Sequence, residues 1–300
     1  MRDSAVFSLG APAREGAFFA ARENPMVAFL LAVIAAAPAP ACNPVPAPAV
    51  RFTPGEQLRY KLDVLGADVG TFEVTLEIPQ GADRERATLM ARSRAKTSAF
   101  VSTNLGRYEA FISTLLRPEL MPVHFREELD EGDNHRSVEV DFPSRGGKLP
   151  AKATYNGKAE AIDLAATPAA RDILSTFLFL RAQPLKTGTP VCAEVYAARK
   201  MWTFSGAVGP REQIETPLGK FNAVRIDMTA TRQDDPNVKR GAHVWVTDDD
   251  RRLPLVAVGD VRGKTIRAQL VEAPASRLKT AATKPERKTG APRVGTSIGR

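Results

Sequence analysis

The chain has few of the residues that mark a small stapled scaffold or a metal site. Only two of its 300 residues are cysteines, Cys42 and Cys192, which excludes a fold held together by several disulfides. It has three histidines, His124, His135 and His243, and none of them has the short His-x-His or His-x3-His spacing of many metal sites. We therefore expect no metal site, and histidines that lie on the surface or on strand faces.

No catalytic signature is present either. Ser175 lacks the Gly-x-Ser-x-Gly context of a serine hydrolase. The acidic clusters at 234–235 and 248–250 lack the spacing of a calcium loop, and such clusters between strands are usually solvated turns. We expect a protein that is not an enzyme and has no cofactor.

The chain also lacks an apolar run long enough to cross a membrane. The apolar run at residues 27–37 has eleven residues, whereas a spanning helix needs about 20. This length fits the core of a secretory signal, and small residues at 39 and 41 suit a signal peptidase. We predict an exported protein of the periplasm or outer membrane, whose mature chain lacks residues 1–41.

Two features near this signal leave alternatives open. Residues 1–25 carry three arginines and three acidic residues, so they lack the positive charge of a signal leader, and Met26 is an alternative start. Cys42 follows the predicted cleavage site and is a candidate for lipid attachment, although Ala39 replaces the usual leucine. With lipidation, Cys192 would be a single buried thiol; without it, Cys42 and Cys192 can form a disulfide.

Basic charge is concentrated at the C-terminus. The chain has a formal net charge of +8, and residues 273–300 hold seven basic side chains against one acidic. This tail is poor in large apolar residues, which predicts disorder. We expect a solvated appendage or a contact with an anionic envelope surface, and no nucleic-acid partner.

The predicted order of segments along the chain is lead and signal (1–41), Pro/Ala linker (42–50), one β-rich domain (51–271) and basic tail (272–300).

Between linker and tail, polar and apolar residues alternate with a period of two, as in half-buried strands. Leu58, Tyr60 and Leu62 fall on one face and Arg59 on the other, and similar runs recur to residue 271. The sequence YNGK at 155–158 is the strongest hairpin signal. The pattern predicts about twelve strands.

One segment breaks the alternation. Residues 167–181 place Ile173, Leu174 and Phe177 on a helical stripe, and the initial threonine and proline suit a helix start. We therefore predict a mainly β fold: a curved antiparallel sheet, half-barrel or two-sheet arrangement, with one principal helix (167–181) packed on its concave face. Such a sheet has an apolar inside and a solvated outside.

A few side chains are candidates for an interior role. Three charged residues lie within apolar segments, and because buried charges rarely stand alone we expect internal ion pairing among Glu56, Asp172 and Arg181. Trp245 lies on a predicted strand, where core packing is the default. The alternative is that it lines a ligand cavity with Phe177 and Tyr60.

Four segments, in this order and spacing, carry a family resemblance. They read FTPGE (52–56) with Tyr60 and Gly70, DILSTF (172–177) before Leu180-Arg181, ETPLGKF (215–221), and VWVTD (244–248) before RLP (252–254). Together they resemble the bacterial domain-of-unknown-function family 3108. The resemblance implies a β-rich exported protein without an assigned activity. The expected architecture is also similar to half-barrels that carry lipids or lipoproteins across the periplasm.

Two classes of function follow as alternatives. The first is a binding or carrier module whose concave apolar sheet holds a lipid or a hydrophobic peptide segment. The second is a structural or interaction protein of the cell envelope, with a filled core and no ligand. An enzyme is a distant third.

Overall fold

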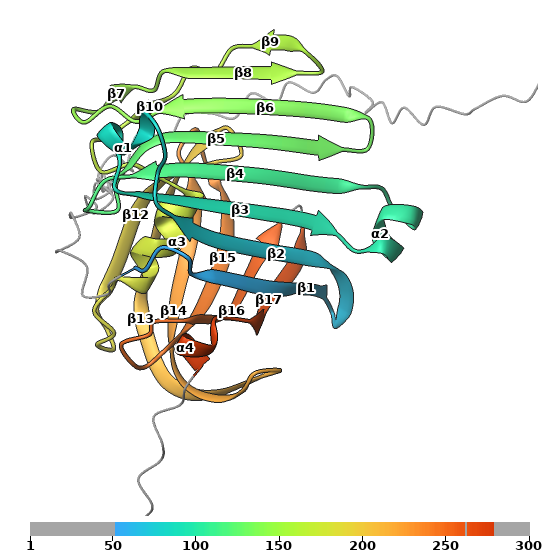
Figure 1. The fold of residues 1–300 in the computed structure, drawn as a ribbon, viewed down its shortest axis with the longest axis vertical. Coiled ribbons are helices and arrows are strands. Elements are labelled where there is room, and N and C mark those ends of the chain that lie inside the picture. Colours follow the sequence, from blue (N-terminus) through green and yellow to red (C-terminus); the bar gives the residue numbers. More distant parts are fainter. Residues whose placement is uncertain (1–51, 262, 279–300) are drawn as a thin grey trace, which may run out of the picture. The chain divides into compact units, whose positions relative to one another are not determined.

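A curved sheet of fifteen strands dominates the part of the chain that the structure, a computed structural model, describes: residues 52–261 and 263–278 (Figure 1). Its N-terminal half is a series of antiparallel neighbours. These strands are β1 (Gln57–Val64), β2 (Ala67–Glu77), β3 (Leu89–Thr97), β4 (Tyr108–Leu116), β5 (Pro122–Glu131), β6 (Asn134–Asp141), β8 (Ala151–Tyr155) and β9 (Lys158–Glu160).

The C-terminal half continues the same sheet. Its strands are β11 (Arg171–Asp172), β12 (Pro190–Ala197), β13 (Lys200–Thr216), β14 (Gly219–Arg232), β15 (Asp235–Thr247), β16 (Pro254–Val261) and β17 (Lys264–Glu272). Only β11 and β12 pair in parallel. The two halves join where β17 pairs antiparallel with β1. Figure 1 shows that β2–β6 run across β12–β17, which lie behind them.

Smaller elements connect these strands. They are the two-stranded sheet of β7 (Gly147–Lys148) and β10 (Ala165–Ala166), and the helices α1 (Asp83–Arg86), α2 (Ala99–Asn104), α3 (Ile173–Arg181) and α4 (Ala275–Leu278). No helix in the described part of the chain is long and apolar enough to span a bilayer.

The alternation in the sequence sets which face of each strand is buried. Along β1, Leu58 and Tyr60 are buried while Arg59 is exposed. The predicted hairpin at 155–158 is present: Tyr155 pairs with Lys158, and Asn156 and Gly157 have φ values of 48° and 75°, as a type I′ turn requires. The mainly β prediction is confirmed, although the described residues form seventeen strands rather than about twelve.

The core lies between the two halves of the sheet. Phe125 and Val138 of the N-terminal half pack in one cluster with Tyr196 and Met201 of the C-terminal half. A second cluster joins Leu58 and other residues of β1 to residues of β14, β16 and β17. Each half therefore covers the apolar face of the other.

Helix α3 fills one end of this inner space. Leu174 and Leu178 pack against Leu76 and Leu116 of the N-terminal half. On its other side, Phe179 and Leu180 pack with residues of β12 and β14, among them Val191, Val195, Val224 and Ile226. The helix is thus enclosed by both halves of the sheet.

The predicted start of this helix, at residue 167, is wrong. The helix begins at Ile173, because Asp172 caps it: its Oδ1 accepts hydrogen bonds from the backbone N–H groups of Leu174 (2.8 Å) and Ser175 (3.1 Å). Thr167 instead donates its backbone N–H to Glu194 (3.0 Å). Ile173, expected in the buried stripe, is 37% exposed.

The C-terminal boundary also differs from the prediction. The composition predicts a disordered tail over residues 272–300, but Ala273 is buried and Leu278 of α4 packs against the cluster that contains Leu58. The folded region therefore extends to Leu278.

Some predictions concern segments outside the described residues. These are the signal peptide, Met26, Cys42, the linker and residues 279–300, with the predicted contact of the tail with an anionic surface. Cys192, half-buried on β12, is disulfide-bonded.

Candidate functional site

The end of the inner space away from α3 is a pocket of about 600 Å³. It lies between the inner face of β1–β6 and residues of β15, β17 and the β12–β13 turn. Its lining combines apolar and charged side chains: Leu62, Phe72, Ala95, Tyr108, Glu127, Leu129, Arg136, Val138, Ala198, Arg199, Arg240 and Ile266. A volume between about 300 and 1,000 Å³ is typical of small-molecule sites.

Sheet register brings the apolar lining together. Phe72, Ala95, Ala110 and Leu129 form one row across β2–β5, because each residue is paired with the next on the neighbouring strand. All of them point to the inner face, since side chains alternate along a strand. Three of the four, all except Ala110, are only partly buried. This row gives the pocket an apolar floor that is open to an occupant.

Two arginines of the pocket lie against aromatic rings. The guanidinium of Arg136 is 5.0 Å from the ring centroid of Tyr155, which is its partner across β6 and β8. That of Arg240, on β15, is 4.9 Å from the ring of Trp202. Such cation–π contacts hold the planar group in place while leaving its N–H edges free to bind an oxygen anion.

The third arginine, Arg199, lies in a tight turn. Ala198 and Arg199 join β12 to β13, and their φ values of 50° and 62° place both in the left-handed region that favours glycine. Arg199 pairs with Glu160 of β9. A side chain with a Cβ is thus held in a backbone conformation of elevated energy at the border of the pocket.

One carboxylate shares this environment. Glu127 lies on the inner face of β5, between Phe125 and Leu129. Burial raises the pKa of Glu127, and the positive charges of Arg199 and Arg136 oppose that rise. The lining of the pocket thus contains one acidic and three basic side chains.

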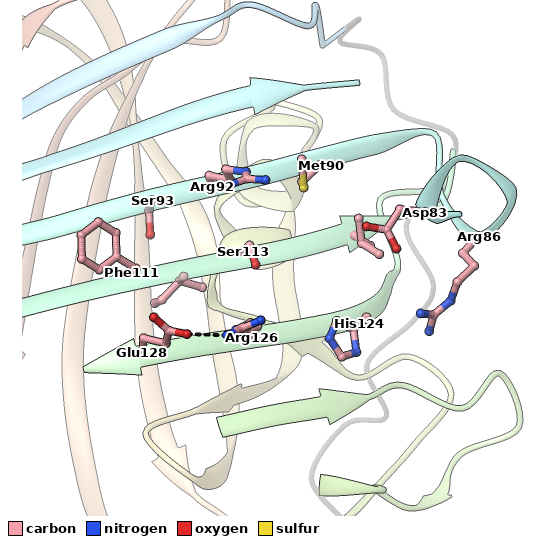
Figure 2. Close-up of a pocket in the computed structure, with 12 residues that line it drawn as sticks. Asp83, Arg86, Met90, Arg92, Ser93, Phe111, Ser113, His124, Arg126 and Glu128 are labelled. Atoms are coloured by element: carbon pink, nitrogen blue, oxygen red, sulfur yellow. Dashed lines mark hydrogen bonds and ion pairs between the residues drawn. The ribbon is translucent and has the colours of Figure 1, made fainter. Parts of the chain in front are cut away.

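A second hollow, of about 500 Å³, lies on the outer face of β3–β5 beside α1 (Figure 2). Figure 2 shows Arg92, Ser113 and Arg126 in one row across the three strands, with Asp83 and Arg86 at the end. Its charges are largely paired with carboxylates: Arg92 with Glu77, Arg126 with Glu128, and Arg86 with Asp141, among others. This groove is a salt-bridged outer surface with little unpaired charge to recognise a ligand.

Of the three charged residues that the sequence singled out, the structure pairs two. The Arg181 Nη1 atom donates to the Glu56 Oε1 atom at 2.5 Å, and both side chains are almost completely buried. Arg181 also donates from Nε to the carbonyl of Arg252 (2.9 Å) and lies against the rings of Phe52 and Phe177. Arg181 thus links α3 to the segment just before β1 and to the loop before β16.

Asp172 is not part of that pair. Besides capping α3, its Oδ1 atom accepts a hydrogen bond from the Thr114 hydroxyl of β4 at 2.9 Å. Burial raises the pKa of this carboxyl, and the hydrogen bonds from Ser175, Thr114 and Leu174 oppose the rise. Asp172 therefore fixes the start of the helix against the N-terminal half of the sheet.

The three proposed cavity-lining aromatics pack with one core cluster instead of forming the pocket floor. Tyr60 is buried, and its hydroxyl donates to the carbonyl of Pro254 (3.0 Å). Phe177 and Trp245 are partly buried against the same cluster. The Trp245 indole donates to Glu212 at 2.6 Å.

Each of the three histidines faces an aspartate on a neighbouring strand. The Nδ1 atoms of His124, His135 and His243 lie 2.9, 2.8 and 2.6 Å from carboxylate oxygens of Asp141, Asp130 and Asp227, respectively. Within residues 52–261 and 263–278, no three His, Cys, Asp or Glu side chains are grouped so that they could hold a metal ion.

Comparison with known proteins places the chain in a family. The model of the family "Protein of unknown function (DUF3108)" matches residues 58–270. The chain belongs to DUF3108. No curated protein matches it.

One solved structure supports the fold of this DUF3108 chain, and two others match it more weakly. A beta-barrel-like protein of the domain of unknown function DUF1849 from Brucella abortus is 13% identical, with a TM-score of 0.51 over 75% of this chain and 98% of that one. A candidate exported protein with a YmcC-like fold from Bacteroides fragilis is 7% identical, with a TM-score of 0.33 over 76% and 99%. A candidate lipoprotein from Parabacteroides distasonis is 8% identical, with a TM-score of 0.33 over 76% and 98%.

Sequence reasoning missed the charged residues that converge in the pocket of this DUF3108 chain. Glu127 and Arg136 fall in phase with the inward apolar residues of their strands, and that break in alternation was a readable signal. Arg240 gives the same signal, because it is in phase with Ala242 and Val244 of β15, which pack inward. No local signal marks Arg199, which lies in a turn.

Proposed function

We propose that this protein is a non-catalytic binding module of the cell envelope that holds the apolar part of a ligand in its inner pocket. The observation that carries the proposal is the pocket itself: about 600 Å³, between two halves of a sheet whose remaining inner space is filled by α3 and core side chains. The apolar run followed by small residues at 27–41 supports an exported location.

Exposed apolar side chains at the same end of the molecule add support. Leu65 follows β1 and is 100% exposed, while Phe100 and Leu105, in and after α2, are 71% and 80% exposed. They lie just beyond the strand ends that carry Leu62 and Ala95 of the pocket (Figure 1). Large apolar groups left in water at this end suit the exchange of a hydrophobic ligand.

The test is to extract the purified full chain with organic solvent and to identify bound amphiphiles by mass spectrometry. We expect a bound apolar compound in the native chain and several-fold less in Ala95→Phe, because the phenyl ring occupies the floor of the pocket. Thr71→Phe is the matched control, since Thr71 of β2 faces outward. Equal amounts in both variants would place the ligand elsewhere.

The alternative is a structural envelope protein without a ligand. It predicts that no compound is extracted from the native chain and that a fluorescent alkyl probe does not bind. That pair of results would contradict the binding proposal and favour the structural one.

A further inference from the structure

The distribution of charge around the inner pocket is uneven. Leu62, Phe72, Ala95 and Ile266 come from β1, β2, β3 and β17, which are neighbours in the middle of the sheet. The arginines come from the flanks: β6 on one side, and β15 and the β12–β13 turn on the other. Folding of the two halves over each other brings these flanks together, so the pocket has an apolar floor and a basic side.

The three arginines lie around the β12–β13 turn. Arg199 is in that turn and pairs with Glu160 of β9. Arg136 lies against Tyr155 of β8, the strand that pairs with β9. Arg240 stacks on Trp202, whose indole donates to the carbonyl of Ala197 at the start of the turn (3.2 Å).

This positive charge is only partly neutralised by the protein. In the described part of the chain, neither Arg136 nor Arg240 forms an ion pair; each has an aromatic face beside it instead. Arg199 is paired with Glu160, and Glu127 is the one carboxylate among the lining residues. Three guanidinium groups therefore exceed the two nearby carboxylates, and two of the three keep their N–H edges available.

We infer that the ligand of this pocket is an anionic amphiphile, whose alkyl chain lies on the floor and whose carboxylate or phosphate head is bound by Arg136, Arg199 and Arg240. This inference rests on the proposed binding function and names the ligand class. Guanidinium groups match carboxylate and phosphate oxygens with paired N–H donors, which a neutral or cationic head cannot use. The backbone of the β12–β13 turn supports this inference. Arg199 has a positive φ, which costs free energy in a residue with a Cβ, and its side chain borders the pocket. Backbone strain of this kind is concentrated at functional sites.

Calorimetric titration of the full chain with amphiphiles of one alkyl length separates head group from chain. The probes are dodecyl phosphate, dodecanoate, dodecanol and dodecylamine, each below its micelle concentration or solubility limit, with inorganic phosphate as the probe without a chain. We expect both anionic probes to bind at least about tenfold more tightly than dodecanol. Dodecylamine should bind more weakly than dodecanol, and inorganic phosphate should not compete at matched concentrations.

Substitutions assign the effect to the basic side of the pocket. Arg136→Gln and Arg240→Gln should each weaken dodecyl phosphate binding about tenfold, the loss expected for one charge-assisted contact. Dodecanol binding should stay within about twofold, because its contacts are with the floor. Glu127→Gln removes the opposing carboxylate and should tighten dodecyl phosphate binding. Arg92→Gln, on the outer face, is the matched control and should change neither.

The outcomes distinguish the two proposals. Equal affinity for dodecanol and dodecyl phosphate in the native chain would overturn the anionic head group and leave the apolar-ligand function standing; this comparison needs no variant to fold. Binding of inorganic phosphate as tight as that of dodecyl phosphate would also overturn it, in favour of a free anion. Binding of none of the probes would contradict the proposed function itself.

Discussion

At the scale of single residues, the buried ion pair between Glu56 and Arg181 shows how charge can serve the fold. The pair lies in an apolar region between β1 and α3, and 125 residues separate its members in the chain. A buried pair contributes little net stability compared with apolar residues of the same size, but loss of one member leaves an uncompensated charge. The pair therefore acts mainly as a constraint on how α3 sits against β1.

This gives a prediction for Glu56. Glu56→Gln should lower the free energy of unfolding by about 3–5 kcal/mol, because the Arg181 charge stays buried without its counter-charge. Glu73→Gln is the matched control: Glu73 pairs with Arg59 at the surface at 2.9 Å, and its loss should cost no more than about 1 kcal/mol. Urea unfolding of both variants is the measurement. Similar small losses would mean that water reaches Arg181.

Residue-scale features of the site were only partly predictable. Glu56, Asp172 and Arg181 stood out because they interrupt apolar segments, and such interruptions are visible in the sequence. Their partners were not visible, because hydrogen bonds such as that from Thr114 to Asp172 join residues 58 positions apart. Arg199 looks like an ordinary polar residue of a turn until the two halves of the sheet meet, whereas Arg240 interrupts the inward apolar row of its strand.

At the scale of elements, strands were easier to predict than the helix. Alternation and the Asn156-Gly157 turn mark strands directly, because burial of one face has the same period as the side chains. The helix start failed for a local reason: threonine and proline at 167–168 suit a helix, yet Asp172 with Ser175 forms the stronger capping box. Arg171 and Asp172 then form the short strand β11, which a helix from residue 167 would exclude.

The packing of α3 gives the second prediction. Leu178→Ala should lower the free energy of unfolding by about 2–5 kcal/mol, because Leu178 is completely buried among residues of β2, β3 and β4 and leaves a cavity. Ile173→Ala, on the same helix, should cost clearly less, since Ile173 is 37% exposed. Thermal unfolding followed by circular dichroism compares the two. Equal losses would mean that α3 is not enclosed by the sheet as described.

At the scale of the whole molecule, the two halves of the sheet depend on each other. The pairing of β1 with β17 joins strands from opposite ends of the folded region, and the clusters around Phe125 and around Leu58 both contain residues of both halves. The inner apolar face of each half is covered mainly by the other half and by α3. Contacts of such long sequence separation form only when most of the chain is in place.

We therefore expect residues 52–278 to unfold in one cooperative step. The chain has two tryptophans, Trp202 and Trp245, both in the C-terminal half, so their fluorescence reports on that half, whereas far-ultraviolet circular dichroism reports on all strands. The two thermal midpoints should coincide, as two-state behaviour requires.

A cavity in the N-terminal half makes this test sharper. Leu116→Ala, on β4, removes a completely buried side chain far in sequence from both tryptophans and should cost about 2–5 kcal/mol. Because the halves share their core, the fluorescence midpoint should fall by as much as the dichroism midpoint, roughly 2–4 °C for each kcal/mol in a domain of this size. A fluorescence midpoint that stays unchanged while the dichroism midpoint falls would show that the C-terminal half folds without its partner. The shared core, and with it a pocket formed between the two halves, would then have to be abandoned.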